Sequence, residues 1–324
     1  MSIRRFALAM AALAAPLVLA GVPANAQEKS VAVTAIVEHP ALDAVRDGVR
    51  DELEAQGYVP GENLAFTYET AQGNPAIASQ IARQFAGENH DVIVPISTPS
   101  AQAVLSATDA VPVVFSAVTD PVAARLVGDP DNPKGRVTGV SDLSPVKRQL
   151  ELIREVMPEA KTVGVLYNPG EANSVKILEL LKQYGPEYDF NIVESVSPKS
   201  SGVLSATRNL VGKADAVYIP TDNTIISALE SAIKVGMDND LPIFAADTAS
   251  VPRGAAMALG FDYYDLGRQT GRIVVRILEG EAPSEIPVES VQKTQLAVNP
   301  ASAKRMGLEI PQAVMDRADE VVEE

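Results

Sequence analysis

Short apolar segments alternate with longer segments of mixed polarity along the chain from about residue 31 onward. The apolar segments lack the alternation of a strand with one wet face, which is typical of strands buried on both faces of a parallel sheet. The longer segments carry apolar residues at helical spacing. This order predicts an α/β fold in which strands and helices follow one another.

The alternation runs through two successive series of similar length. The first series predicts strands at 31–37, 64–69, 91–96 and 111–116, and helices at 40–56, 74–88, after 97 and near 121. The second predicts strands at 137–140, 162–167, 191–195, 215–220 and 241–246, and helices at 144–156 and from 171, 201 and 224. A strand and an amphipathic helix within 254–281 follow, and then two short strands at 286–291 and 294–299.

Two series predict two doubly wound parallel-sheet lobes rather than one sheet. We expect residues 27–141 plus about 249–280 in the N-terminal lobe, and 142–248 plus about 281–324 in the C-terminal lobe. The chain would then cross between the lobes three times. Such a three-segment hinge permits closure and restrains twisting.

The N-terminus has a different pattern from the rest of the chain. Arg4 and Arg5 precede an apolar stretch that ends in "ANA" at 24–26. This is the pattern of a secretory signal peptide, residues 1–26, cleaved after Ala26. A transmembrane anchor is the alternative, but Pro16 interrupts the segment, which is shorter than a span requires. We therefore expect a periplasmic protein without direct membrane insertion.

Composition excludes several function classes. The chain has 324 residues, a formal net charge of −15 and no cysteine. An acidic chain of this kind is not expected to bind nucleic acid. The lack of cysteine excludes disulfides, thiolate metal sites and a lipid anchor on a cysteine. We expect no cofactor, and a monomer.

Ligands of parallel α/β sheets bind at the carboxyl ends of strands, so the loops there are the candidate site. After the strand 91–96, Pro99 suits a first helical turn, which leaves the N–H groups of Ser100 and Ala101 free to face an anion beside the Thr98 hydroxyl. Thr98 as a simple helix cap is the alternative interpretation.

Carboxylates occupy equivalent points of the second series. Asp222 and Asn223 follow the strand 215–220, and Glu171, Asn173 and Ser174 begin the helix after 162–167. Each could cap a helix, but together they suit an ammonium group. Donors in one lobe and acceptors in the other predict a zwitterion such as an amino acid. Asp247 fits either a hinge contact or the ligand.

Aromatic and histidine side chains near the strand ends have two interpretations each. Tyr167, Phe261, Tyr263 and Tyr264 fit either a pocket wall or the core. His39 reads as a polar loop residue rather than a catalyst.

Catalytic signatures are lacking. The chain has only two histidines, no H-E-x-x-H, no G-x-S-x-G, no P-loop and no G-x-G-x-x-G after a strand. A catalytic pair of carboxylates is not excluded by the sequence, because 42 acidic residues make chance pairs common. The pattern favours binding over catalysis, and no metal site is expected.

Six stretches together resemble a known family. They are "VAVTAIVEHPALDAVRDGVRDELEAQGY", "ISTPSAQAVL", "VVFSAVTDPVAARLV", "TGVSD", "VGVLYNPGEANS" and "YIPTDNTI". The resemblance is to the substrate-binding proteins of bacterial ABC transporters, in the family that includes tryptophan- and tyrosine-type binders. It implies a type I periplasmic-binding fold, a small-molecule ligand and an ABC permease in the inner membrane as partner. Carried over by position, it places Thr98 to Ser100, Thr119-Asp120, Glu171 to Ser174 and Thr221 to Asn223 at the cleft.

These observations predict a periplasmic substrate-binding protein of an ABC importer. Its ligand would be a small zwitterion, an amino acid with an aromatic or branched side chain. The alternatives left open are a sugar or nucleoside binder of the same fold and a ligand-sensing partner of a membrane receptor.

Overall fold

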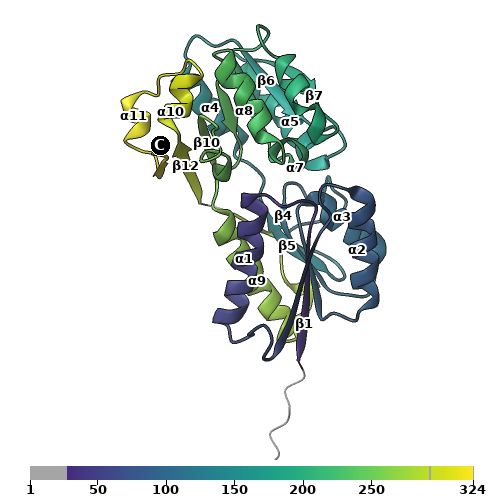
Figure 1. Cartoon of the computed structure of the whole chain (residues 1–324). Coiled ribbons are helices and arrows are strands. Elements are labelled where there is room, and N and C mark those ends of the chain that lie inside the picture. The colour runs from purple at the N-terminus through teal and green to yellow at the C-terminus, as the bar shows by residue number, and fades with distance from the viewer. Residues whose placement is uncertain (1–27, 292, 324) are drawn as a thin grey trace, which may run out of the picture.

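The computed structural model describes residues 28–291 and 293–323. The predicted signal peptide, residues 1–26, lies outside this part of the chain. The described residues form two lobes, one above the other in Figure 1, each with a sheet between helices. The predicted α/β fold of two doubly wound lobes is confirmed.

The first sheet has the strand order β11-β5-β4-β3-β1-β2 and is parallel throughout. Its strands are β1 (Lys29–Ala35), β2 (Leu64–Thr70), β3 (Val92–Ile96), β4 (Val113–Val118), β5 (Val137–Ser141) and β11 (Glu289–Ser290). Helices α1 (Pro40–Ala55), α2 (Pro75–Gly87), α3 (Thr98–Ala107) and α9 (Tyr263–Leu278) cover it.

The second sheet has the order β13-β12-β10-β9-β8-β6-β7, with only the β10–β12 pair antiparallel. Its strands are β6 (Thr162–Tyr167), β7 (Asn191–Val196), β8 (Ala216–Ile219), β9 (Ile243–Ala245), β10 (Met257–Phe261), β12 (Thr294–Val298) and β13 (Glu320–Val321). Helices α4 (Val146–Val156), α5 (Ala172–Tyr184), α6 (Val203–Arg208), α7 (Asn223–Ile226), α8 (Leu229–Asp238), α10 (Pro300–Arg305) and α11 (Gln312–Met315) surround it. Four short 3-10 turns complete the described chain: η1 (Gly185–Tyr188), η2 (Ser200–Gly202), η3 (Thr248–Ser250) and η4 (Pro283–Glu285).

Each lobe has its own hydrophobic core. Every residue of β3, β4 and β5 is buried, as are those of β8, β9 and β10. Burial on both faces explains why these strands read as continuous apolar runs. The helices contribute to the two separate clusters of buried side chains on either side of the cleft.

The positions of two crossings between the lobes differ from the prediction. The structure places β10 in the second sheet beside β9, so the chain returns to the first lobe after Phe261 rather than near 249. Strand β11 pairs with β5 in the first sheet, so the last crossing follows Ser290 rather than residue 280. The predicted crossings at about 249 and 281 are therefore wrong. An apolar strand pattern does not reveal which of two sheets the strand joins.

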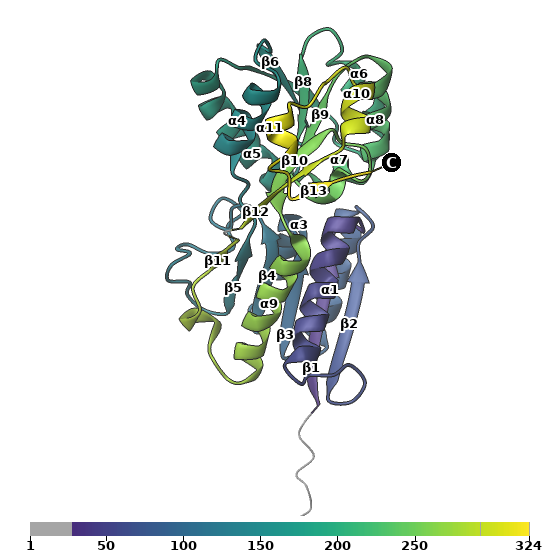
Figure 2. The same ribbon diagram turned by 90° about the vertical axis from the view of Figure 1, so that its left-hand side faces the viewer.

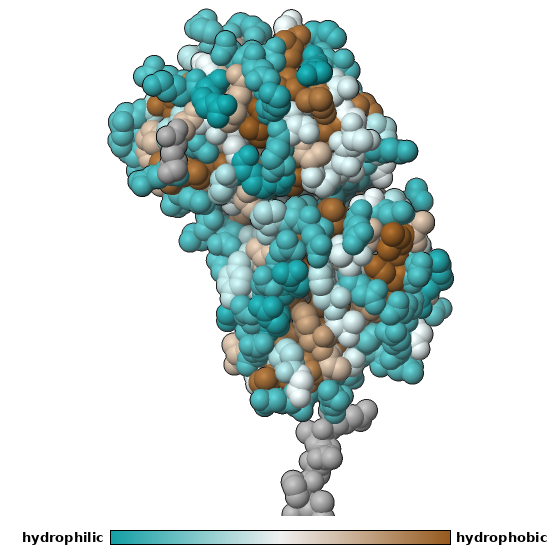
Figure 3. Space-filling model, in the orientation of Figure 1, coloured by the Kyte–Doolittle hydropathy of each residue, from teal (hydrophilic) through white to brown (hydrophobic). Residues whose placement is uncertain are grey.

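In the described part of the chain, no helix has both the length and the apolar character needed to span a bilayer. The face in Figure 3 is mainly hydrophilic, with smaller apolar groups between.

Helices α1 and α9 pack unusually closely on the first sheet, side by side in Figure 2. Two glycines allow this approach. A Cβ on Gly267 would lie 2.3 Å from the carbonyl oxygen of Val45, and one on Gly48 would lie 2.3 Å from that of Tyr264. This contact fixes α9, the element that returns from the second lobe, onto the first.

We predict that Gly267→Ala lowers the free energy of unfolding by about 1–3 kcal/mol, because the added methyl group forces the two backbones apart. Urea unfolding followed by circular dichroism measures the change. Gly87→Ala is the matched control, since a Cβ there meets nothing within 4 Å and alanine is the better helix former. Equal stability of the two variants would contradict the proposed role of Gly267.

Candidate functional site

A small pocket lies between the two lobes. Except for Ala117, which is inside β4, its lining residues lie on segments that follow the carboxyl ends of strands or in the next helix. They are His39, Ala41, Leu42, Ser97, Thr98, Ala117, Thr119, Asp142 and Tyr263 from the first lobe and the crossings, and Asn173, Thr221, Asn223, Ile226 and Asp247 from the second. This is the position where parallel α/β sheets bind ligands.

Several buried polar atoms of the pocket have no hydrogen-bond partner. In the described residues, five buried side-chain atoms lack one, and four of them belong to His39 (Nδ1 and Nε2), Thr98 (Oγ1) and Asn173 (Oδ1). Buried polar groups are nearly always paired in folded proteins. The pocket therefore presents unpaired donors and acceptors from both lobes to whatever occupies it.

Two of the seven non-glycine residues with positive φ in the described chain line the pocket. Ser97 has φ 81° and Ala117 has φ 53°, both unusual for residues with a side chain. Such conformations persist where the surrounding structure imposes them, and they cluster at ligand sites. Ser97 precedes α3 without a side-chain cap. The Ala101 N–H donates to the Ser97 carbonyl at 3.1 Å, so it is not free for a ligand as predicted, and only the N–H groups before it start the helix without a side-chain acceptor from Ser97.

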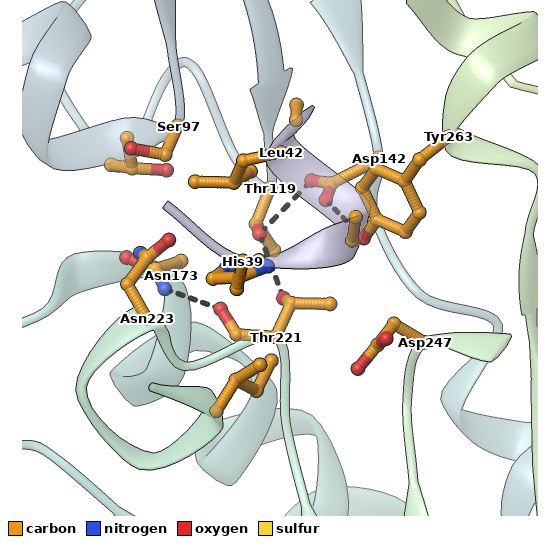
Figure 4. A pocket seen from close by; sticks show the side chains of 14 residues that line it. His39, Leu42, Ser97, Thr119, Asp142, Asn173, Thr221, Asn223, Asp247 and Tyr263 are labelled. Carbon is orange, nitrogen blue, oxygen red and sulfur yellow. Dashed lines mark hydrogen bonds between the residues drawn. The ribbon is translucent and has the colours of Figure 1, made fainter. Parts of the chain in front are cut away.

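Six of the predicted site residues line the pocket: Thr98, Thr119, Asn173, Thr221, Asn223 and Asp247. The Asn173 amide donates to the carbonyl of Thr221 at 2.7 Å. The hydroxyl oxygens of Thr119 and Thr221 lie 3.5 Å apart across the cleft (Figure 4). These contacts join the strand ends of the two lobes.

Asp222 does not line the pocket, so its predicted contact with an ammonium group is wrong. Its Oδ1 accepts from the backbone N–H of Ile225 at 2.9 Å. Its Oδ2 accepts from the N–H of Asn168 at 2.6 Å and from the hydroxyl of Ser174 at 2.7 Å. The side chain is fully buried within the second lobe, and burial together with the Glu171 charge raises its pKa. Asp222 therefore caps the N-terminus of α7, and the Ser174 hydroxyl donates a hydrogen bond that holds the Asp222 carboxylate in this position.

Glu171 likewise braces the second lobe. Its carboxylate accepts from the amide nitrogens of Asn223 and Asn173, at 2.6 and 3.0 Å, and from the Thr224 hydroxyl at 2.7 Å. The predicted ligand contact of Glu171 is therefore wrong. It orients Asn173 and Asn223, which do line the pocket.

Three other predicted residues also lie off the pocket. Ser100 and Ala101 are buried within α3, and neither lines the pocket. The carboxylate of Asp120 lies 2.8 Å from the ammonium of Lys176, on α5 of the other lobe. Asp120 is thus a bridge between the lobes rather than a ligand contact.

Sequence reasoning missed Ala41, Leu42, Ala117, Asp142 and Ile226 as lining residues, and the structure places Tyr263 at the pocket wall rather than only in the core. Asp142 is the most informative of the missed residues. It follows β5 directly, which is the same strand-end signal that indicates the other loops. The hydroxyls of Thr119 and Tyr263 donate to its two oxygens at 3.1 and 2.9 Å.

His39 is buried rather than a polar loop residue, with 7% of its surface exposed. Burial, with a smaller contribution from the Arg253 charge, lowers its pKa from 6.5 to about 4. Asn223 lies beside the ring, yet neither ring nitrogen forms a hydrogen bond. The imidazole is therefore neutral at physiological pH.

Comparison with known proteins assigns the fold and site to a family. Residues 30–322 match the profile described as "ABC transporter substrate binding protein". The chain belongs to this family. The resemblance of the six sequence stretches is thereby confirmed.

Relatives of this ABC transporter substrate-binding protein include amino-acid binders. A protein of Clostridioides difficile named "Tyrosine-binding protein" is 37% identical, over 87% of this chain and 82% of the relative. A crystal structure of a conserved domain protein from Vibrio cholerae is 50% identical, with a TM-score of 0.90, and covers 91% of this chain and all of that one.

Two further structures indicate the arrangement of the lobes. A domain from Streptococcus pneumoniae in complex with L-Trp is 32% identical and gives a TM-score of 0.88. A ligand-free, open substrate-binding protein from Clostridium difficile is 39% identical but gives only 0.69. Both cover 91% of this chain and all of theirs. The overall structure of this substrate-binding protein is thus more similar to the Trp complex than to the ligand-free, open structure, although its sequence identity to the Trp complex is lower.

We predict that Lys176→Gln shifts the ligand-free protein toward the open state about two- to fivefold, because a partly exposed ion pair contributes roughly 0.5–1 kcal/mol. Spin labels on one introduced cysteine per lobe, in a chain that otherwise has none, report the interlobe distance. Lys182→Gln is the control, since Lys182 lies on the same helix but pairs with Glu194 within its own lobe. An equal effect of both variants would refute the bridge.

We predict that His39 makes folding pH-dependent. Its pKa is lower in the folded than in the unfolded chain, so the unfolded chain binds the extra proton between pH 6.5 and 4. Stability from this group is complete above pH 6.5 and falls by about 3 kcal/mol as the pH approaches 4. Urea unfolding of the wild type and His39→Gln isolates this contribution as a difference. A difference that does not change with pH would contradict it.

Proposed function

We propose that this chain is the periplasmic receptor of an ABC importer, which closes on an amino acid with an aromatic or branched side chain and delivers it to an inner-membrane permease. The observation that carries the proposal is the set of unpaired buried polar atoms on His39, Thr98 and Asn173. They come from both lobes and converge on one pocket, as expected of a site completed by a small polar ligand.

The composition of the pocket supports a zwitterion with an apolar side chain. The N-terminus of α3 and the Thr98 hydroxyl offer donors to a carboxylate. Asp142 and Asp247 provide negative charge, and Leu42, Ile226 and the Tyr263 ring provide apolar surface. The relatives named for tyrosine binding and solved with L-Trp support an aromatic side chain.

The periplasmic location rests on the signal peptide that the sequence predicts. Without a cysteine to carry a lipid, the mature receptor would diffuse freely between its ligand and the permease. Ligand-driven closure requires only that the ligand bind the closed state better than the open one, by a few kcal/mol.

We predict that isothermal titration with the twenty amino acids detects binding of L-Trp, L-Tyr or L-Phe in preference to charged or small ones, because the pocket has apolar walls and no lysine or arginine among the residues that line it. Glucose, myo-inositol and adenosine serve as the comparison ligands. Binding of one of these with none of the amino acids would refute the proposed ligand class.

Thr98→Val tests the pocket itself in the same titration. We expect about tenfold weaker binding, since one hydrogen bond to a charged group is lost. Ser106→Ala is the control on the same helix, because the Ser106 hydroxyl bonds only to the exposed carbonyl of Gln102. An unchanged affinity of Thr98→Val would place the carboxylate elsewhere.

A further inference from the structure

The charge of the pocket is unbalanced. Among its lining residues Asp142 and Asp247 are the carboxylates, and no lysine or arginine lies among them. Arg253 is near enough to influence His39 and Asp247. Its Nε pairs with Glu230 at 2.8 Å, whereas its Nη1 is buried without a hydrogen-bond partner. The lining residues of the pocket thus include two acidic groups and no lysine or arginine, and Arg253 is the nearby cation.

Both carboxylates are held in place by neutral donors. Asp142 accepts one hydrogen bond on each oxygen, from Thr119 and Tyr263. Asp247 accepts from the backbone N–H and the hydroxyl of Ser250, at 2.9 and 2.7 Å. A carboxylate oxygen can accept about two hydrogen bonds. Each group is therefore oriented but keeps acceptor capacity for a further donor.

Burying the Asp142 and Asp247 carboxylates without a positively charged partner is unfavourable in free energy. Asp142 and Asp247 are 2% and 1% exposed, and a buried carboxylate without a counter-charge is strongly disfavoured. Burial raises the pKa of both, and the charge of Asp247 raises that of Asp142 further. Asp142 therefore lies close enough to Asp247 to feel its charge.

The remaining polar groups lie toward another part of the pocket. Figure 4 shows Asp142, Tyr263 and Asp247 on one side, and Ser97, Asn173 and Asn223 on the opposite side. The unpaired atoms of Thr98 and Asn173, which are 1% and 3% exposed, are independent evidence that a polar ligand completes this pocket. Of these unpaired atoms, the Thr98 hydroxyl can donate to an anion, whereas the Asn173 Oδ1 is an acceptor. The side with Asp142 and Asp247 carries the carboxylates and is the one suited to a cation.

We propose that Asp142 and Asp247 together hold the ammonium group of the ligand, the role that the sequence assigns to Asp222. This assignment rests on the proposed function and adds the residues that select an amino acid over its deaminated analogue. An ammonium group has three donors, which matches two carboxylates approaching from different segments.

The assignment also links recognition to closure. Asp142 lies on the first crossing, and its bond to Tyr263 ties it to the start of α9 on the second crossing. Asp247 belongs to the second lobe, where it begins η3 after β9. A cation between them attracts a group at the hinge and a group on the second lobe at once, so it stabilises the closed arrangement.

The test compares matched ligands with and without the ammonium group. The pairs are L-Trp with indole-3-propionate, L-Tyr with 3-(4-hydroxyphenyl)propionate and L-Phe with 3-phenylpropionate, titrated calorimetrically into the wild type, Asp142→Asn and Asp247→Asn. We expect the wild type to prefer the amino acid at least a hundredfold. Each variant should reduce that preference at least tenfold, with the deaminated analogue bound as well as before or better.

Controls separate this role from a loss of structure. Asp215→Asn removes a carboxylate that only accepts from the N–H groups of Lys161 and Thr162 at the other end of the sheet, and should leave the preference unchanged. Thermal unfolding of each variant shows whether it folds, and the ratio of the two affinities is independent of a general loss of active protein.

Three results would overturn the assignment. Equal weakening of both members of a pair would mean that the carboxylates only shape the pocket. If the variants lost affinity for L-Tyr and L-Trp but not for L-Phe, the two carboxylates would bind the hydroxyl or indole N–H of the ligand side chain instead of its ammonium group. A wild type that binds no amino acid would refute the proposed function as well, whereas the first two results leave it standing.

Discussion

The parallel pairing of strands is the constraint on which the rest of this structure depends. It places every strand-to-helix turn of a sheet at one edge, so polar side chains far apart in the sequence meet there. The first sheet is parallel throughout, and in the second only β12 runs against its neighbour β10. Because the two sheets turn these edges toward each other, Thr119 and Thr221 come within 3.5 Å. The pocket follows from the topology, and no separate domain is needed to build it.

The sequence contains enough information to predict this architecture and the segments that form the site, but not the direction of each side chain. Asp222 and Asp142 both follow a buried strand, and both are fully buried. Asp222 turns inward because a four-residue helix begins beside it, whose N–H groups need an acceptor. Asp142 precedes an extended crossing and bonds to side chains at the pocket instead. A strand-end position predicts the neighbourhood of a residue, whereas the hydrogen-bond demand of the following turn decides which way it points.

The lobe boundaries were less predictable for a related reason. The apolar run of β10 suits a buried strand in either sheet, and only its pairing with β9 and β12 assigns it to the second. Strand β11 has two residues and little apolar character, so its place beside β5 leaves almost no trace in the sequence. Pairing partners are non-local, and local periodicity does not encode them.

Closure of such a pocket has opposing contributions. Bringing the lobes together buries the unpaired atoms of His39, Thr98 and Asn173 and brings two carboxylates into one small space, all of which disfavours the closed state. The ion pair between Asp120 and Lys176 acts in the opposite direction, but a partly exposed pair contributes too little to offset several buried polar groups. A ligand that pairs these groups removes the larger cost. If the proposed function holds, the protein does not need a strong attraction between its lobes, because the atoms proposed to recognise the ligand also oppose closure in its absence.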